Sequence, residues 1–226
     1  MLSDLPIWIP ISFSLVTFLT IYLFLAASKW SKTLLAIIVG FMVVQVFLSI
    51  QGFYLKIDTI PPRFILMLAP SLILMVIVFS SKRGKSFLEK LDIKMLTLLH
   101  IIRIPVEFIL WALFLNETIP ERMTFEGLNY DILAGLTAPV IYYFYFIQKS
   151  ISKKWILGWN LLSLALLLNI VINAILSTPS VFQQLAFNQP NIAILHFPFI
   201  WLPSIVVPIV MFSHLAAIRF FRRTKL

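Results

Sequence analysis

Seven runs of apolar residues divide this sequence, and their length constrains the fold more than any other feature. A helix rises about 1.5 Å per residue, so about 20 residues span the ~30 Å hydrocarbon core of a bilayer. Backbone polar groups in lipid must be paired within their own segment, so each run is predicted to be a transmembrane helix. The runs cover residues 7–27, 34–54, 64–80, 93–115, 132–147, 155–175 and 198–218.

The composition supports the same fold class. Of the 226 residues, 61% are hydrophobic and only 12% are charged, which is far from the balance of a soluble domain. We therefore expect an all-α fold, a polytopic bundle of seven transmembrane helices forming one integral membrane domain over residues 1–226. The absence of cysteine excludes disulfides, thiolate metal ligands and cysteine nucleophiles.

Basic residues predict the orientation of the bundle. Cytoplasmic loops are enriched in Lys and Arg, and fourteen of the 18 basic residues fall on one side of the predicted helices. The N-terminus is therefore predicted outside and the C-terminus in the cytoplasm, in a bacterial-type inner (plasma) membrane. The net charge of +9 lies on short loops facing one membrane surface, so we expect a lipid partner and no nucleic acid. The fourteen are Lys29, Lys32, Lys82, Arg83, Lys85, Lys90, Lys94, Lys149, Lys153, Lys154, Arg219, Arg222, Arg223 and Lys225.

Three ionisable residues interrupt the fourth run. His100, Arg103 and Glu107 are spaced by three and four residues, so a helix brings them within about 60° of each other on one face. A charge at the centre of a bilayer costs about 3 kcal/mol or more, so such residues usually face a partner or a cavity. Pro105 removes one backbone donor and frees the carbonyl of Ile101. This helix is predicted to carry a hydrated polar site inside the membrane.

Helix depth places further polar residues beside this face. Gln45, Asn169 and Asn173 lie near the predicted level of Glu107, where they could complete a site for a ligand or a proton. An alternative is that these three amides form hydrogen bonds between helices without touching a ligand.

A second polar layer is predicted nearer the cytoplasm. His214 lies about 7 Å from that surface, at nearly the depth of His100, and Asn160 falls in the same layer. If the fourth and seventh helices are neighbours, the two histidines could be axial ligands of a haem or bind a metal. Zinc would need further ligands, so the sequence identifies no metal site of its own.

These residues support three functional hypotheses. In the leading one, the protein resembles a transporter or channel that binds or moves a proton, an ion or a small polar molecule. Glu107 would be the titrating or ligand-binding carboxylate, Arg103 would set its charge, and His100 would link it to the cytoplasm. The first alternative is a haem- or metal-dependent membrane enzyme or electron carrier that uses His100 and His214. The second is a non-catalytic sensor or assembly subunit, in which Arg103 and Glu107 form only a structural ion pair.

The loop between the fourth and fifth runs is acidic. It contains Glu117, Glu121, Glu126 and Asp131, and we interpret it as a solvated outer loop rather than a cation site.

Short matches also indicate an internal repeat. Lys29-Trp30 precedes the second run as Lys154-Trp155 precedes the sixth, and Pro-Ser pairs begin at Pro70 in the third run and at Pro203 in the seventh. Two parallel three-helix repeats joined by the fourth helix would give this pattern.

Overall fold

The computed structural model describes residues 5–223, and these residues form helices and connecting loops without strands. Lys225 of the predicted basic set lies outside the described residues. The helices other than α4 agree with the apolar runs to within a few residues at most ends, with α5 and α6 together covering the fourth run. The helices are α1 (Trp8–Ala27), α2 (Lys32–Ile50), α3 (Ile65–Ser80), α4 (Lys82–Glu89), α5 (Ile93–Leu99), α6 (Arg103–Leu115), α7 (Ile132–Tyr142), α8 (Lys153–Ser177) and α9 (Val207–Arg223).

Short turns of tighter or wider helix connect or extend them. A 3₁₀ turn, η2 (His100–Ile102), joins α5 to α6, and π turns extend α7 at η4 (Tyr143–Ile147) and precede α9 at η6 (Leu202–Val206). The loops contain three more 3₁₀ turns: η1 (Phe53–Leu55), η3 (Glu121–Met123) and η5 (Ala193–Leu195).

Several helices have the length and composition of membrane spans. Five qualify in the described part of the chain: α1, α2, α8, the continuous segment Ile93–Leu115 and the segment Leu202–Arg223. The bent pair α3 and α4 would make a sixth, whereas Ile132–Ile147 is apolar but shorter. The all-helical fold expected from the sequence is confirmed, and several of its helices are long and apolar enough to span a membrane.

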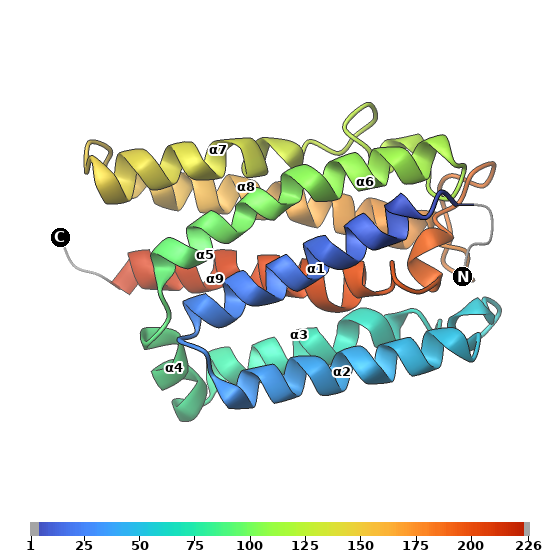
Figure 1. The fold of residues 1–226 in the computed structure, drawn as a ribbon, viewed down its shortest axis with the longest axis horizontal. Coiled ribbons are helices and arrows are strands. Elements are labelled where there is room, and N and C mark those ends of the chain that lie inside the picture. The colour runs from blue at the N-terminus through green and yellow to red at the C-terminus, as the bar shows by residue number, and fades with distance from the viewer. Residues whose placement is uncertain (1–4, 224–226) are drawn as a thin grey trace.

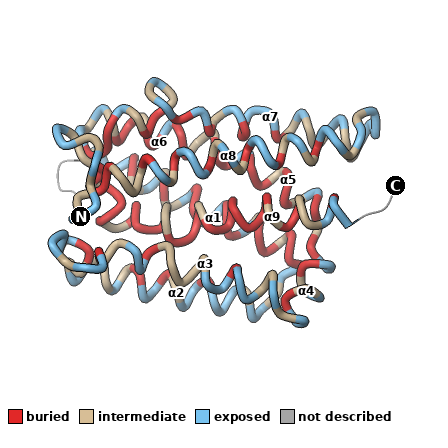
Figure 2. Tube along the Cα trace, turned by 180° about the vertical axis from the view of Figure 1, so that it is seen from behind, coloured by how far each residue is buried: buried red, intermediate tan, exposed pale blue. Residues whose placement is uncertain are grey.

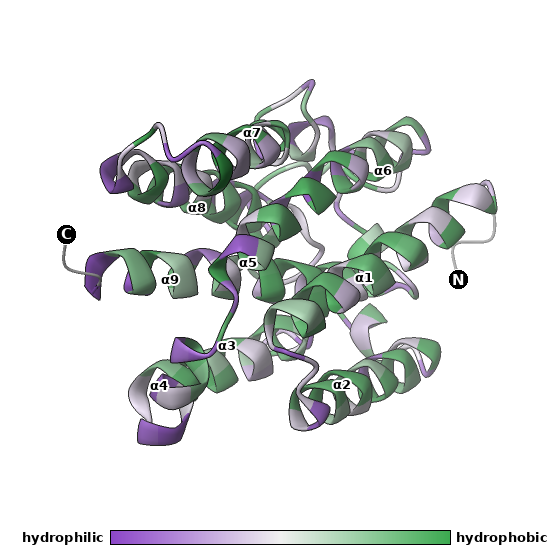
Figure 3. Cartoon of the chain, turned by 60° about the vertical axis from the view of Figure 1, so that its left-hand side comes forward, coloured by the Kyte–Doolittle hydropathy of each residue, from purple (hydrophilic) through white to green (hydrophobic). Residues whose placement is uncertain are grey.

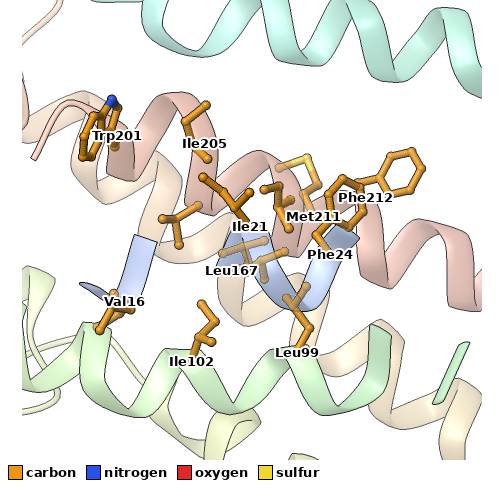
Figure 4. Close-up of a cluster of buried hydrophobic side chains, with 14 of the residues drawn as sticks. Val16, Ile21, Phe24, Leu99, Ile102, Leu167, Trp201, Ile205, Met211 and Phe212 are labelled. Carbon is orange, nitrogen blue, oxygen red and sulfur yellow. The ribbon is translucent and has the colours of Figure 1, made fainter. Parts of the chain in front are cut away.

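The helices pack in three layers (Figures 1 and 3). The helices α1 and α9 lie in the middle, α7 and α8 cover one side, and α2 and α3 form the opposite layer. The segment α5–η2–α6 starts against α1 and α9 and runs toward α7. Buried residues concentrate in the middle, and the outer faces of α2, α7 and α8 are exposed (Figure 2). Side chains from α1, α5, η2, α8, η6 and α9 meet in the apolar core shown in Figure 4. The fourth apolar run therefore connects the middle of the bundle with the side that α7 covers.

Local chemistry explains the shape of this central segment. Asp92 begins α5 because its side chain accepts hydrogen bonds from the backbone nitrogens of Lys94 (2.8 Å) and Met95 (3.3 Å). Pro105 cannot donate to the carbonyl of Ile101, and this carbonyl belongs to the tight turn η2, which ends three residues before Pro105. As a result, the helix changes pitch where its ionisable residues begin.

One helix was not expected from the sequence. Residues 82–89 were interpreted as part of a loop, but they form α4, which turns by 87° from α3. Ser81 caps the new helix by accepting a hydrogen bond from the Gly84 nitrogen at 3.1 Å. A Cβ at Gly84 would lie 2.1 Å from the Val78 carbonyl oxygen, so only glycine permits this approach. Hydrophilic residues of α4, the α7–α8 turn and the end of α9 lie toward one end of the bundle (Figure 3).

Candidate functional site

Arg103 is the centre of a buried polar cluster, and its ion pair is not the predicted one. Its Nη1 lies 3.2 Å from Oδ1 of Asp131, which precedes α7. Its Nη2 lies 3.0 Å from Nε2 of His214 on α9, and Nη1 donates to the Ser163 carbonyl of α8 at 3.5 Å. Arg103 thus joins α6 to three other elements. Glu107 is not its ion-pair partner in the described residues, so the predicted i, i+4 pair is wrong.

Glu107 is instead held by the acidic loop. The Nδ2 of Asn129 donates to both carboxylate oxygens of Glu107, at 2.7 and 2.6 Å, and to the Met123 carbonyl at 3.0 Å. The Oδ1 of Asn129 accepts from the backbone nitrogen of Asp131 at 3.0 Å. This end of the loop therefore folds into the bundle and is not solvated, which corrects the sequence interpretation for Asp131.

The hydrogen bonds of His214 identify its tautomer. Arginine can only donate, so Nε2 of His214 must accept from Arg103. Its Nδ1 lies 2.9 Å from Oδ1 of Asn160, which accepts, while Nδ2 of Asn160 donates to the Ile156 carbonyl at 2.8 Å. We therefore assign His214 as a neutral imidazole with its proton on Nδ1.

His100 and His214 lie together, as their predicted depth required, but they do not form a haem site. Their rings are stacked, with centroids 3.8 Å apart and planes 11° from parallel, and Trp159 contacts both edge-on. Axial ligands must point a nitrogen at the iron from opposite sides, at about 2 Å each. Stacked rings leave no space for that iron, and both nitrogens of His214 already have partners. Among the described residues there is also no group of three or more His, Cys, Asp or Glu that could hold a metal ion.

The predicted amides lie elsewhere. Gln45 donates to the Leu66 carbonyl at 3.2 Å and accepts from the Tyr54 hydroxyl at 2.6 Å, so it joins α2 to α3 and η1. Burial raises the pKa of Tyr54 to about 12, which keeps this donor protonated. The structure does not bring Gln45 to the Arg103 cluster.

Asn169 and Asn173 hold the acidic loop against α8 through hydrogen bonds. Asn169 donates to the Leu128 carbonyl at 2.9 Å, and Oδ1 of Asn173 accepts from Nε of Arg122 at 3.0 Å. These bonds support the alternative in which the amides connect elements of the fold. They bear on Glu107 only indirectly, because they position the loop that carries Asn129.

A cavity of about 240 Å³ borders the cluster. Arg103, Glu107 and Asp131 form part of its wall, and the rest is almost entirely apolar. The apolar residues come from α3, α6, α8, η6 and α9, and include Met67, Leu72, Leu167, Val171 and Val206. The site is therefore an apolar cavity whose wall carries three ionisable residues, Arg103, Glu107 and Asp131.

Sequence reasoning missed Asn129 and Asp131. Both lie in a loop, where polar residues are ordinarily solvated, and here they are 0% and 5% exposed. One signal was available: Arg103 needs a buried acid, and Asp131 directly precedes the next apolar run.

Gly135 allows α7 to approach this cluster, which leads to a testable expectation. A Cβ at Gly135 would lie 2.9 Å from Cγ1 of Ile104 and 3.2 Å from Cβ of Arg103. Gly135→Ala should therefore force α7 outward and destabilise the protein by about 1–3 kcal/mol. Unfolding in mixed micelles measures this change.

Gly158 provides the matched control for that variant. A Cβ at Gly158 of α8 meets nothing within 4 Å among the described residues. Gly158→Ala should stabilise α8 by up to about 1 kcal/mol, since alanine favours helix. Equal effects at the two glycines would contradict the close approach of α7.

Comparison with known proteins bears on the part of the chain that holds the site. Residues 60–222 match the model of a family described as a domain of unknown function (DUF8737). Comparison with curated proteins found no match, and neither did comparison with solved structures. The matched residues include the whole Arg103 cluster and the wall of its cavity, whereas α1 and α2 lie before them.

Proposed function

The chain belongs to the DUF8737 family, and we propose that it is a membrane protein that binds a small amphipathic molecule in the cavity beside Arg103. The ligand's apolar body would lie against the aliphatic wall, and its polar group would face Arg103, Glu107 and Asp131. An amphipathic ligand is a more specific proposal than the sequence-based prediction that the site binds or moves a proton, an ion or a small polar molecule.

The apolar lining is the observation that carries the proposal. A hydrated ion or a fully polar solute would lose its water in this cavity and regain few polar contacts, which is costly. An amphipathic molecule matches both parts of the wall. The volume of about 240 Å³ is slightly below the roughly 300–1,000 Å³ of most ligand pockets, which favours a small ligand.

Unpaired atoms of the cluster favour a hydroxyl group on this ligand. Within residues 5–223, Nε of Arg103 is buried without an acceptor, and Oδ1 of Asp131 has no hydrogen-bond donor. The 3.2 Å separation between Arg103 and Asp131 is short enough for an ion pair but lacks hydrogen-bond geometry. A hydroxyl both donates and accepts, so a single group could bond both residues.

Extraction of bound molecules tests the proposal. Protein purified in mild detergent would be extracted with organic solvent and analysed by mass spectrometry. The wild type should release a hydroxyl-bearing amphipath, and Ala174→Phe, which fills the cavity from α8, should lose it. Leu74→Trp, which lies outside this cavity, is the matched control and should retain it. A wild-type extract without such a molecule, or its retention by folded Ala174→Phe, would overturn the proposal.

The proposal includes seven spans, with the N-terminus outside and the C-terminus in the cytoplasm of a plasma membrane. The long helical segments run back and forth along the bundle, so the described chain starts and finishes at opposite ends (Figure 1). Basic residues of α4, the α7–α8 turn and the end of α9 support a cytoplasmic surface at one of these ends.

Cysteine labelling checks this orientation. The chain contains no cysteine, so single substitutions can be labelled without background. Glu126 and Ser150 are exposed and belong to loops on opposite sides of the proposed membrane. In intact cells a membrane-impermeant maleimide should label Glu126→Cys and not Ser150→Cys, and permeabilised cells should label both. The reverse pattern in intact cells would invert the topology.

A further inference from the structure

A second cavity of about 240 Å³ lies between α2 and α3. The ends of α1, α4 and α9 also border it, and its wall includes Phe24, Ile38, Leu74, Phe87 and Phe212. In the described residues it shares no lining residue with the cavity beside Arg103. It is therefore a separate candidate binding site.

The interior of this second cavity offers little to a polar ligand. Its hydroxyls belong to Ser71 and Ser204, and both are already bonded within the protein. Ser71 donates to the Ser204 carbonyl at 3.0 Å, and Ser204 donates to the Ile200 carbonyl at 2.8 Å. The other lining residues are apolar, so hydrocarbon is the favoured occupant.

The position of α4 adds a charged rim. Phe87 of α4 lines the cavity, and the same short helix and its C-cap carry Lys82, Arg83, Lys85 and Lys90. Its one acidic residue, Glu89, forms an exposed ion pair of 3.5 Å with Arg223. On the α2 side, Lys32 lies two residues before the lining residue Leu34. Cationic side chains thus lie beside an apolar cavity.

We infer that this cavity holds one acyl chain of an anionic phospholipid, whose headgroup lies against α4. The sharp bend after α3 places the basic helix across the end of the bundle, where a headgroup would meet it. A basic side chain near an anionic membrane surface contributes about 1 kcal/mol, so several act together on such a headgroup. The apolar wall favours an acyl chain, and the basic residues at the rim favour an anionic headgroup.

Lipid binding to delipidated protein tests the inference. Native mass spectrometry would count lipids retained after adding phosphatidylglycerol or phosphatidylcholine with identical acyl chains. One phosphatidylglycerol should remain bound, with a preference of about tenfold or more over phosphatidylcholine. Equal retention of the two lipids, or a second copy of the protein in place of a lipid, would overturn the inference.

Variants separate the two parts of the site. Leu74→Trp fills the cavity and should abolish retention of the lipid, and Ile38→Phe provides a second filling variant if Leu74→Trp does not fold. Lys82→Gln combined with Lys85→Gln should keep the cavity but reduce the preference for phosphatidylglycerol. Ala174→Phe fills the other cavity and should leave the lipid in place. Unchanged lipid retention by a folded filling variant would also overturn the inference.

Discussion

Replacing Arg103 with leucine is expected to destabilise the fold by about 3–5 kcal/mol. The change leaves Asp131 as a buried carboxylate without its cation and removes the donor to Nε2 of His214. Arg103 and Asp131 are only 2% and 5% exposed, so bulk water solvates the unpaired carboxylate poorly. The free energy of unfolding in mixed micelles measures the loss.

Two double variants identify the partner of Arg103. Arg103→Leu combined with Asp131→Asn removes both members of the observed ion pair and should recover part of the lost stability. Arg103→Leu combined with Glu107→Gln should recover less, because Asn129 still holds the side chain at position 107 and Asp131 stays unpaired. Greater recovery with Glu107→Gln would instead favour an ion pair within α6.

Asn129→Ala should release the acidic loop from the bundle and cost about 3 kcal/mol. The single amide group of Asn129 donates to Glu107 and Met123, so its loss leaves a buried carboxylate without a donor. Thr124 is 0% exposed in this loop, and a cysteine there should react slowly with a maleimide. Adding Asn129→Ala should accelerate the labelling of Thr124→Cys.

Asn169→Ala is the control for the loop. It removes an exposed hydrogen bond to the Leu128 carbonyl and the 3.3 Å bond that Oδ1 of Asn169 accepts from Asn173, and it leaves Glu107 and Asn129 bonded. Its cost should be about 1 kcal/mol or less, with little change in the labelling of Thr124→Cys. If Asn169→Ala and Asn129→Ala accelerate labelling equally, the contact between Asn129 and Glu107 does not hold the loop.

The sequence predicted depth along the helices better than direction around them. Counting residues placed His100, His214 and Asn160 in one layer, and the structure stacks or bonds these three side chains. The same counting put Gln45 level with Glu107, but Gln45 instead bonds Tyr54 and the Leu66 carbonyl. Rise per residue gives height, whereas the neighbours of a side chain depend on how helices pack.

Loops and short helices were the hardest parts to predict. Asn129 and Asp131 are polar residues in a loop, a setting that usually indicates exposure to solvent. They are buried because Asp131 pairs with Arg103 and Asn129 donates to Glu107. The helix α4 has eight residues and few apolar ones, so a search for membrane-length runs does not detect it. Its start depends on the side chain of Ser81 and on the space that Gly84 leaves.

The tautomer of His214 has a consequence for proton leakage across the bundle. The hydrogen bonds run in one direction, from Arg103 to His214, then to Asn160 and to the Ile156 carbonyl. A relay needs each member to accept a proton on one side and release one on the other, but a guanidinium keeps its proton and the carbonyl has none to pass on. As bonded here, this row of polar groups cannot pass a proton from Arg103 to the Ile156 carbonyl.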